Sequence, residues 1–292
     1  MAIIETQDLT YIYGQKTPFE MRAVDNVSIA IEEGEFLGVI GHTGSGKSTL
    51  IQMLNGLIRP TSGKVLLNGE DIWEKPKEIR RVRFKVGMVF QYPEYQLFEE
   101  TVLKDIMFGP KNMGLSEEEA EEKALQAAKF TDLKDELLSK SPFELSGGEK
   151  RRAAIAGVIS MDPDVLILDE PTAGLDPRGR DVLLSQLQNY HRERKNTIIL
   201  VSHSMEDIGR VADRILVMNG NKVDMLAPTR EVFRQGEALE KAGLRMPQIT
   251  KIMRELKKAG LPVNEDALTV EEALRQLIPL LSPSISERGE LK

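Results

Sequence analysis

Residues 41–48 read Gly41-His42-Thr43-Gly44-Ser45-Gly46-Lys47-Ser48. The stretch matches the pattern G-x-x-x-x-G-K-[ST]. It lies between an apolar run at 36–40, which predicts a buried strand, and a helical pattern at 49–54. Glycines in such a loop allow backbone N–H groups to face a phosphate chain, and the start of the next helix adds partial positive charge. Lys47 adds a full charge, and Ser48 is placed to bind Mg²⁺. We therefore interpret the stretch as a nucleotide-binding P-loop.

The composition of the 292-residue chain is that of a soluble globular protein, with 41% hydrophobic and 29% charged residues. No apolar run approaches the ~18 residues of a membrane-spanning helix, and the first residues lack the pattern of a signal peptide. The absence of cysteine excludes disulfides and thiolate metal sites, which favours a cytoplasmic location. A net charge of −7 argues against nucleic acid as a partner.

Continuous apolar runs at 165–168 and 197–201 predict further buried strands, and they alternate with helical patterns. We therefore expect an α/β fold, with a P-loop NTPase (RecA-like) core whose parallel sheet is covered on both faces. An antiparallel β subdomain is expected before the P-loop, with a polar loop through Arg22 and a strand at 27–31. A helical subdomain is expected at about 92–162, including a helix at 117–130 that begins with a capping box.

The end of the chain differs in character, because short amphipathic helical patterns follow one another between glycines and prolines. We expect a core domain at 1–228 and a small, mainly helical domain at 229–292, with a frayed tail from Ser282. The basic run at 80–85 is interpreted as a solvated loop.

Polar side chains follow the predicted strands where a parallel sheet binds ligands, at the carboxyl ends. Asp169 and Glu170 come directly after the run at 165–168, so Asp169 can hold Mg²⁺ and Glu170 can orient or deprotonate a water. Gln91 and His203 each follow a predicted strand. Gln91 can reach the metal or the water, and His203 can donate a hydrogen bond to a γ-phosphate or to the water.

A second phosphate-binding pattern lies about a hundred residues after the P-loop, where Ser146, Gly147 and Gly148 open a predicted helix. Two such helix starts in different subdomains serve one nucleotide most simply if two chains face each other. Each P-loop would then be closed by the partner's Ser-Gly-Gly segment.

Six ordered motifs over roughly residues 1–230 resemble those of an ATP-binding cassette (ABC) ATPase. They correspond to Walker A, Q-loop, signature, Walker B, D-loop and H-loop, at Gly41–Ser48, Gln91, Leu145–Glu149, Val165–Glu170, Ala173–Asp176 and His203. The chain also resembles the second ATPase subunit (A-prime, cobalt-transport-ATPase-like) of energy-coupling factor (ECF) vitamin transporters. That closer resemblance rests on Gly41–Gly44, Asn55–Leu57, Gln91–Val102, Phe108–Asn112 and Ser141–Ser146.

The ECF resemblance implies an ATPase that binds ATP and Mg²⁺ in a sandwich heterodimer with a second homologous ATPase. Hydrolysis would drive uptake of vitamins or other micronutrients through a transmembrane coupling subunit, which carries interchangeable substrate-binding membrane proteins. By analogy the coupling subunit docks on residues 92–100, and the domain after Thr229 holds the ATPase pair together. The chain would lie at the cytoplasmic face of the cell membrane as a peripheral protein.

The resemblance also implies roles for single residues. Tyr13 would stack on the adenine, although Tyr11 competes for that role. The nucleotide in the chain's own P-loop would be served by Lys47, Ser48, Thr49, Gln91, Asp169, Glu170 and His203, and the partner's nucleotide by Ser146, Gly147 and Gly148.

Two departures from the family pattern are Glu149, where the signature usually ends in Gln, and Gly174 in the D-loop. A carboxylate near a triphosphate weakens binding, so Glu149 is expected to face away or to pair with a basic residue. The two departures leave ATP binding intact and leave open whether the two composite sites are equally active.

Two other functions compete with a transport ATPase. A soluble ABC protein that acts on ribosomes or DNA would carry two cassettes, long insertions or a basic surface, and a P-loop kinase would not need a Ser-Gly-Gly signature. The sequence does not reveal the transported substrate.

Overall fold

The computed structural model of the protein describes residues 1–281, and its centre is a six-stranded sheet with the order β11-β10-β4-β9-β8-β7. The strands from β10 to β7 are parallel, and β11 pairs antiparallel to β10 at one edge. The strands are β4 (Phe36–Gly41), β7 (Val86–Val89), β8 (Val165–Asp169), β9 (Thr197–Val201), β10 (Arg214–Asn219) and β11 (Lys222–Pro228). Every residue of β4, β7, β8 and β9 is buried, which confirms the predicted parallel sheet.

A smaller antiparallel sheet combines three strands from before the P-loop with two from after it, and β1 pairs with three of the other strands. Its strands are β1 (Ala2–Tyr13), β2 (Met21–Val27), β3 (Ala30–Glu32), β5 (Ser62–Leu67) and β6 (Glu70–Asp71). The prediction of a loop through Arg22 and of one strand at 27–31 was wrong. The chain breaks between β2 and β3 because Asn26 has a φ of 52° and the Thr6 hydroxyl takes over two ladder hydrogen bonds, donating to Val27 and accepting from Ile29.

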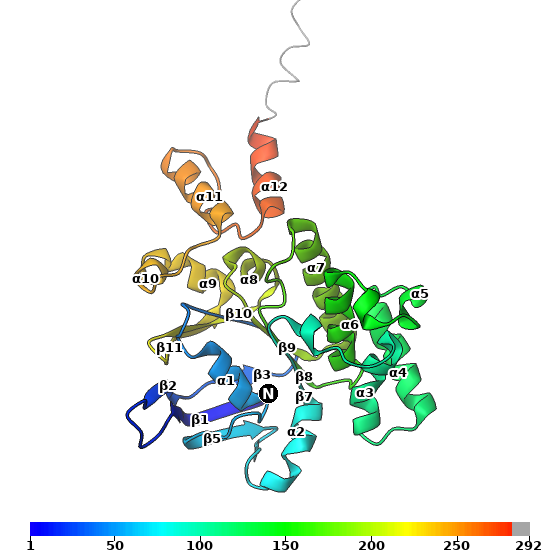
Figure 1. The fold of residues 1–292 in the computed structure, drawn as a ribbon. Coiled ribbons are helices and arrows are strands. Elements are labelled where there is room, and N and C mark those ends of the chain that lie inside the picture. Colours follow the sequence, from blue (N-terminus) through cyan, green and yellow to red (C-terminus); the bar gives the residue numbers. More distant parts are fainter. Residues whose placement is uncertain (282–292) are drawn as a thin grey trace, which may run out of the picture.

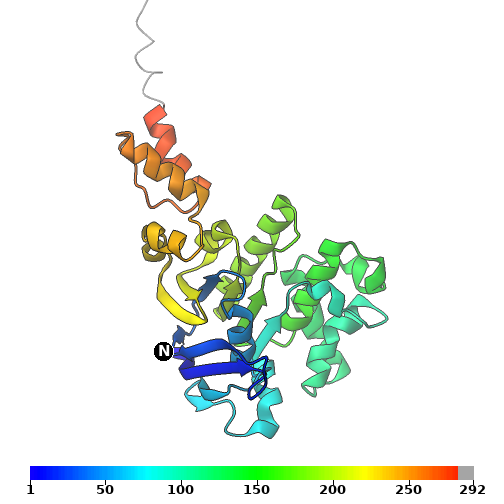
Figure 2. The same ribbon diagram turned by 60° about the vertical axis from the view of Figure 1, so that its left-hand side comes forward.

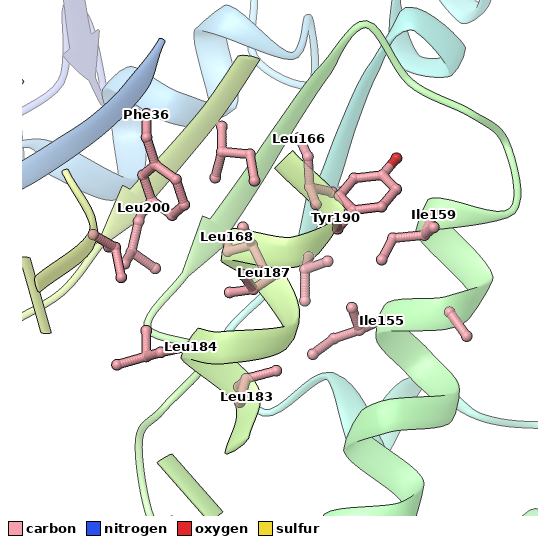
Figure 3. Packing of buried hydrophobic residues seen from close by; sticks show 14 of the residues in the cluster. Phe36, Ile155, Ile159, Leu166, Leu168, Leu183, Leu184, Leu187, Tyr190 and Leu200 are labelled. Carbon is pink, nitrogen blue, oxygen red and sulfur yellow. The ribbon is translucent and has the colours of Figure 1, made fainter. Parts of the chain in front are cut away.

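The two faces of the central sheet bury two separate cores, because alternate residues of β4 point to opposite sides. Leu37 and Val39 face the core between the central sheet, the antiparallel sheet and α1 (Lys47–Leu54). Phe36 and Ile40 face the core under α7 (Pro177–Arg194) and α8 (Met205–Val211). Figure 3 shows side chains of this second core, where Leu183, Leu184, Leu187 and Tyr190 of α7 meet Phe36, Leu166, Leu168 and Leu200 of the sheet.

The helical subdomain expected at about 92–162 lies beside the β7 edge of the sheet (Figure 1). It contains α3 (Val102–Asn112), α4 (Glu117–Phe130), α5 (Asp135–Leu138) and α6 (Gly147–Ile159), with short 3-10 helices η2 (Pro93–Gln96) and η3 (Pro142–Glu144). Ser116 and Glu119 form the predicted capping box of α4. The basic run is not a loop: after η1 (Pro76–Glu78) it forms α2 (Ile79–Lys85).

The C-terminal helices form a separate layer beyond β11, seen from two directions in Figures 1 and 2. They are α9 (Thr229–Arg234), α10 (Gly236–Lys241), α11 (Gln248–Lys258) and α12 (Val270–Leu281). α9 follows β11 directly, and its Val232 and Phe233 belong to the same buried core as the central sheet, so the domain boundary between 228 and 229 stays a prediction. A satellite apolar cluster centred on Met253 and Ala273 joins α11 to α12. The predicted fraying from Ser282 lies outside the described residues.

Tyr190 generates a prediction about stability, because its ring is 1% exposed and its hydroxyl finds no hydrogen-bond partner among residues 1–281. A buried hydroxyl without a partner costs free energy, so Tyr190→Phe should raise the free energy of unfolding by about 1 kcal/mol. Urea unfolding at equal protein concentration measures the change. A lower midpoint in the variant would mean that the hydroxyl is satisfied in solution.

Candidate functional site

The P-loop connects β4 to α1 and leaves the start of that helix open. Gly46 is the N-cap of α1, its φ is 94°, and no side chain caps the helix. A side chain is excluded at this position, because an added Cβ would lie 2.1 Å from the carbonyl oxygen of Ala23. The Ser45 hydroxyl is also buried without a partner in the described part of the chain. Uncapped N–H groups at the start of a helix suit an anionic ligand.

Lys47 supplies the positive charge inside the loop and is 5% exposed. Its Nζ donates to the carbonyl oxygens of Gly41 at 2.8 Å and His42 at 3.0 Å. Burial lowers the pKa of Lys47, and the carboxylates of Glu170 and Asp169 oppose that shift. A phosphate oxygen is a stronger acceptor for this ammonium than a carbonyl, so the geometry favours exchange of the carbonyls for phosphate.

A cleft of about 290 Å³ lies over the P-loop and brings together most of the predicted site residues. Its lining includes Tyr13, Thr43, Gly44, Gly46, Lys47, Ser48, Thr49, Gln91, Glu170 and His203. Gly41, His42 and Ser45 do not line the cleft: Ser45 is buried, and the His42 ring lies 2.8 Å from the Thr43 carbonyl oxygen. The P-loop residues therefore divide into those that face the cleft and those that shape the loop.

The cleft also contains residues that sequence reasoning missed, on β2 and on the turn between β10 and β11. Met21, Arg22 and Ala23 lie where a loop was expected. The Asn221 side chain, in the turn, donates to the carbonyl oxygen of Arg22 at 2.9 Å. Recognising 21–27 as a strand would have placed these residues beside β1, where the predicted Tyr13 lies.

Glu170 lies one residue beyond β8 with a φ of 49°, and its N–H donates to the carbonyl oxygen of Val201 at 3.0 Å. Two of the predicted site residues contact its carboxylate. The Gln91 amide donates to Oε2 at 3.2 Å, and His203 Nε2 lies 2.8 Å from Oε1. The three side chains come from the ends of three parallel strands, so the carboxylate is oriented by groups that cannot move independently of the sheet.

Asp169, the last residue of β8, is 7% exposed and lies below the cleft. Burial raises the pKa of Asp169, whereas a hydrogen bond from Ser48 and the charge of Lys47 oppose the shift. A hydroxyl and a carboxylate in hydrogen-bond contact are a suitable ligand pair for Mg²⁺.

The structure distinguishes the two tyrosines that the sequence left in competition. Tyr13 lines the cleft, is 36% exposed, and its hydroxyl lies 3.2 Å from Oγ1 of Thr49. Tyr11 packs against the core under the antiparallel sheet, and its ring meets that of Tyr13 edge to face at 4.7 Å. Of the two rings, that of Tyr13 borders the cleft, and its stacking on adenine stays a prediction.

The Ser-Gly-Gly segment lies outside this cleft, at the exposed start of α6. Glu149 was expected to face away or to pair with a basic side chain, and within residues 1–281 its side chain hydrogen-bonds to Ser146 instead. Its Oε2 accepts hydrogen bonds from the Ser146 N–H at 2.8 Å and the Ser146 hydroxyl at 2.7 Å, which completes a capping box. These bonds lower the pKa of Glu149, so the carboxylate stays ionised at neutral pH.

A P-loop with an oriented carboxylate, a buried second carboxylate and a histidine at one sheet edge defines a P-loop nucleotide hydrolase. The family model described as ABC transporter matches residues 24–173. The chain is 53% identical over 278 residues to the energy-coupling factor transporter ATP-binding protein EcfA2 of Caldanaerobacter subterraneus subsp. tengcongensis, covering 95% of this chain and 97% of that protein.

Two solved structures extend the comparison. CbiO1 of Clostridium perfringens, part of the ABC transporter complex CbiONQ, has a TM-score of 0.74 and 37% identity, covering 87% of this chain and 99% of that chain. The ATP-binding cassette MJ0796, in a dimeric post-hydrolysis state with ADP and Pi, has a TM-score of 0.70 and 27% identity. The match covers 77% of this chain and 98% of that chain.

The chain belongs to the ABC transporter family and, within it, to the ATP-binding proteins of energy-coupling factor transporters. It is an ABC-type ATPase that powers energy-coupling import by hydrolysing ATP. The fold class and the family resemblance predicted from the sequence are confirmed. The roles of single residues stay predictions.

Two glycines of the P-loop provide a matched test of the cleft. Gly44 has a φ of 82°, and an added Cβ would meet no atom within 4 Å, whereas at Gly46 the Cβ would strike Ala23. Gly44→Ala should cost about 1 to 2 kcal/mol of stability from its backbone conformation and abolish ATP binding by filling the space that phosphate needs. Gly46→Ala should disrupt the loop itself and lower the melting temperature further. Thermal unfolding with titration of a fluorescent ATP analogue measures both, and normal binding by Gly44→Ala would contradict the assignment.

Proposed function

We propose that this chain holds one half of each of two composite ATP sites, in a sandwich heterodimer with a second, homologous ATPase. The observation that carries the proposal is the separation of two phosphate-binding helix starts. The α1 start opens into the cleft, whereas Ser146, Gly147 and Gly148 lie at the exposed start of α6, outside that cleft. The dimeric state of MJ0796 with ADP and Pi is a precedent among similar proteins.

In the cleft of this chain, Lys47 binds the phosphates, Thr49 and the loop N–H groups orient them, and Tyr13 stacks on the adenine. Ser48 and Asp169 would hold Mg²⁺, with Gln91 as a further ligand, and the ion would supply positive charge beside the phosphates. Glu170 takes the proton of the attacking water. His203 and Gln91 orient this carboxylate, as supported by their contacts with its two oxygens.

Glu149 makes the two composite sites unequal. The nucleotide of the partner faces Ser146, and the hydroxyl of Ser146 already donates its proton to Glu149. That hydroxyl can bind a phosphate oxygen only after its bond to Glu149 opens, and the ionised carboxylate repels the phosphate. The site closed by this signature is therefore the weaker one.

A groove of about 490 Å³ supports docking of the transmembrane coupling subunit on residues 92–100. It lies between α2, α3, α6 and the segment around Phe98, and most of its wall is apolar. Phe98 and Phe108 meet edge to face at 5.0 Å and are 58% and 45% exposed. Arg80 and Arg83 of α2 line the same groove. Exposed aromatic rings beside arginines are typical of the centre of a protein interface.

The segment that forms the groove wall is held in place by Asp105 of α3, whose carboxylate accepts from the backbone N–H groups of Phe98 and Glu99 at 3.0 to 3.3 Å. Burial raises the pKa of Asp105, and these two N–H groups oppose the shift. The groove is thus a preformed surface, which lowers the entropy cost of docking.

We assign the region 229–292 to contacts between the two ATPases. Val270, Leu274 and Ile278 form an exposed apolar stripe along α12, at 57%, 47% and 56% exposure. Their spacing of four residues places them on one helix face, as in a helix that packs against a partner.

Within residues 1–281, no helix is long and apolar enough to cross a bilayer. Docking through the groove places the chain peripherally at the cytoplasmic face of the cell membrane.

Glu170→Gln tests the catalytic assignment. The amide keeps the shape of the carboxylate but cannot accept a proton, so turnover should fall about 100-fold or more while ATP binding persists. A stable dimer should accumulate in ATP, measured by size-exclusion chromatography with light scattering. The exposed α7 variant Glu193→Gln is the control and should hydrolyse ATP normally. Normal hydrolysis by Glu170→Gln would remove the assigned role.

Phe98→Glu tests whether a membrane subunit docks in the groove that Phe98 lines. Tagged wild-type chain purified from its native cells in mild detergent should bring down a second ABC ATPase and a very apolar membrane protein. Phe98→Glu should retain the ATPase and lose most of the membrane protein, because a charge replaces an apolar contact in the groove. The control Leu125→Glu, on the outer face of α4, should retain both. Recovery of ribosomes or DNA would favour a different kind of ABC protein.

A further inference from the structure

Arg151 stands out in α6 because it is a buried basic side chain, 5% exposed, in a helix whose other basic residues are not buried. Its guanidinium donates two parallel hydrogen bonds to the Glu94 carboxylate. Nε of Arg151 donates to Oε2 at 3.1 Å, and Nη2 donates to Oε1 at 2.7 Å. The third guanidinium nitrogen, Nη1, donates to the carbonyl oxygens of Pro171 at 3.1 Å and Ala173 at 2.6 Å. One planar group therefore joins three segments.

Each of the three segments has a different place in the site. Glu94 lies in η2, within the docking segment 92–100 and just after Gln91, which bonds to Glu170. Arg151 itself lies one helical turn after the Ser146 start of α6. Pro171 follows Glu170 directly, and Ala173 begins the D-loop. Among the side chains of residues 1–281, Arg151 alone donates hydrogen bonds to both η2 and the stretch 171–173.

Fold stability alone is a weak explanation for this arrangement. The attraction within a buried ion pair often does not exceed the cost of removing both charges from water. A protein with an apolar pair of similar volume at the same place is often as stable. An Arg fork is rigid and binds two partners in fixed directions, which a lysine cannot do. A displacement of Glu94 must therefore move the guanidinium, and with it either α6 or the backbone at 171–173.

We propose that Arg151 is a positioning residue that couples the docking segment to the start of α6 and to the D-loop. A membrane partner that shifts residues 92–100 would thereby reposition the signature Ser-Gly-Gly over the nucleotide held by the partner ATPase. This inference rests on the proposed docking of a membrane subunit at that segment, and it adds the route by which docking reaches the second nucleotide.

The test uses the whole transporter complex, purified through tagged chain and reconstituted in liposomes, with ATP hydrolysis and ATP-driven substrate uptake measured together. The double variant Glu94→Met/Arg151→Met removes the link without leaving an unpaired buried charge. Its control, Glu35→Met/Arg214→Met, removes an ion pair of 3.1 Å at the amino ends of β4 and β10, away from α6 and η2. Arg151→Lys keeps the positive charge but loses the planar guanidinium that bonds to Glu94 and to residues 171–173 at once.

The double variant should assemble and bind ATP, with uptake per ATP hydrolysed lowered about tenfold. Arg151→Lys should show a loss in the same direction, and the control pair should couple normally. Normal uptake per ATP in a folded double variant, or in Arg151→Lys if the double variant does not fold, would overturn the proposal. Loss of the membrane subunit from the double-variant complex would also overturn it, because Glu94 would then serve docking itself. A wild-type complex without any membrane subunit would instead refute the proposed function.

Discussion

The parallel alignment of β7, β8, β9 and β4 is the constraint on which the site depends. Because these buried strands run in one direction, their carboxyl ends meet at one edge of the sheet. The P-loop leaves β4, Glu170 follows β8, His203 follows β9, and Gln91 follows β7. Groups far apart in the chain thus contact one carboxylate, and two cores on opposite faces of the sheet hold them there.

The same architecture leaves the second predicted phosphate-binding helix start outside the cleft of its own chain. The α6 start belongs to the helical subdomain, which covers the β7 edge, whereas the P-loop cleft also draws on β1 and β2. Residues 92–100 connect these two parts, tied to α3 through Asp105 and to α6 through Glu94 and Arg151. A segment that is held by both and exposes aromatic side chains is suited to pass movement between an external partner and the nucleotide.

Much of the fold and of the candidate site could be predicted from local patterns. The all-apolar strands, the P-loop and the capping box of α4 are set by residues close together in the chain, so their periodicity and spacing are readable. The failures occurred where long-range contacts decided the outcome. Thr6 interrupts the strand predicted at 27–31, from more than twenty positions away. The basic run became helix α2, in which Arg80 contacts Asn112 of α3.

The sequence by itself determined that this protein binds a nucleotide, that its core is a parallel sheet, and that a second helix starts with a Ser-Gly-Gly pattern. These properties depend on short motifs with their own backbone geometry. The tertiary structure alone decided that Tyr13 faces the cleft and Tyr11 the core, that Glu149 bonds to Ser146, and that Arg151 joins Glu94 to the D-loop. The reason is that side-chain partners depend on distances across the fold, which neither composition nor spacing specifies.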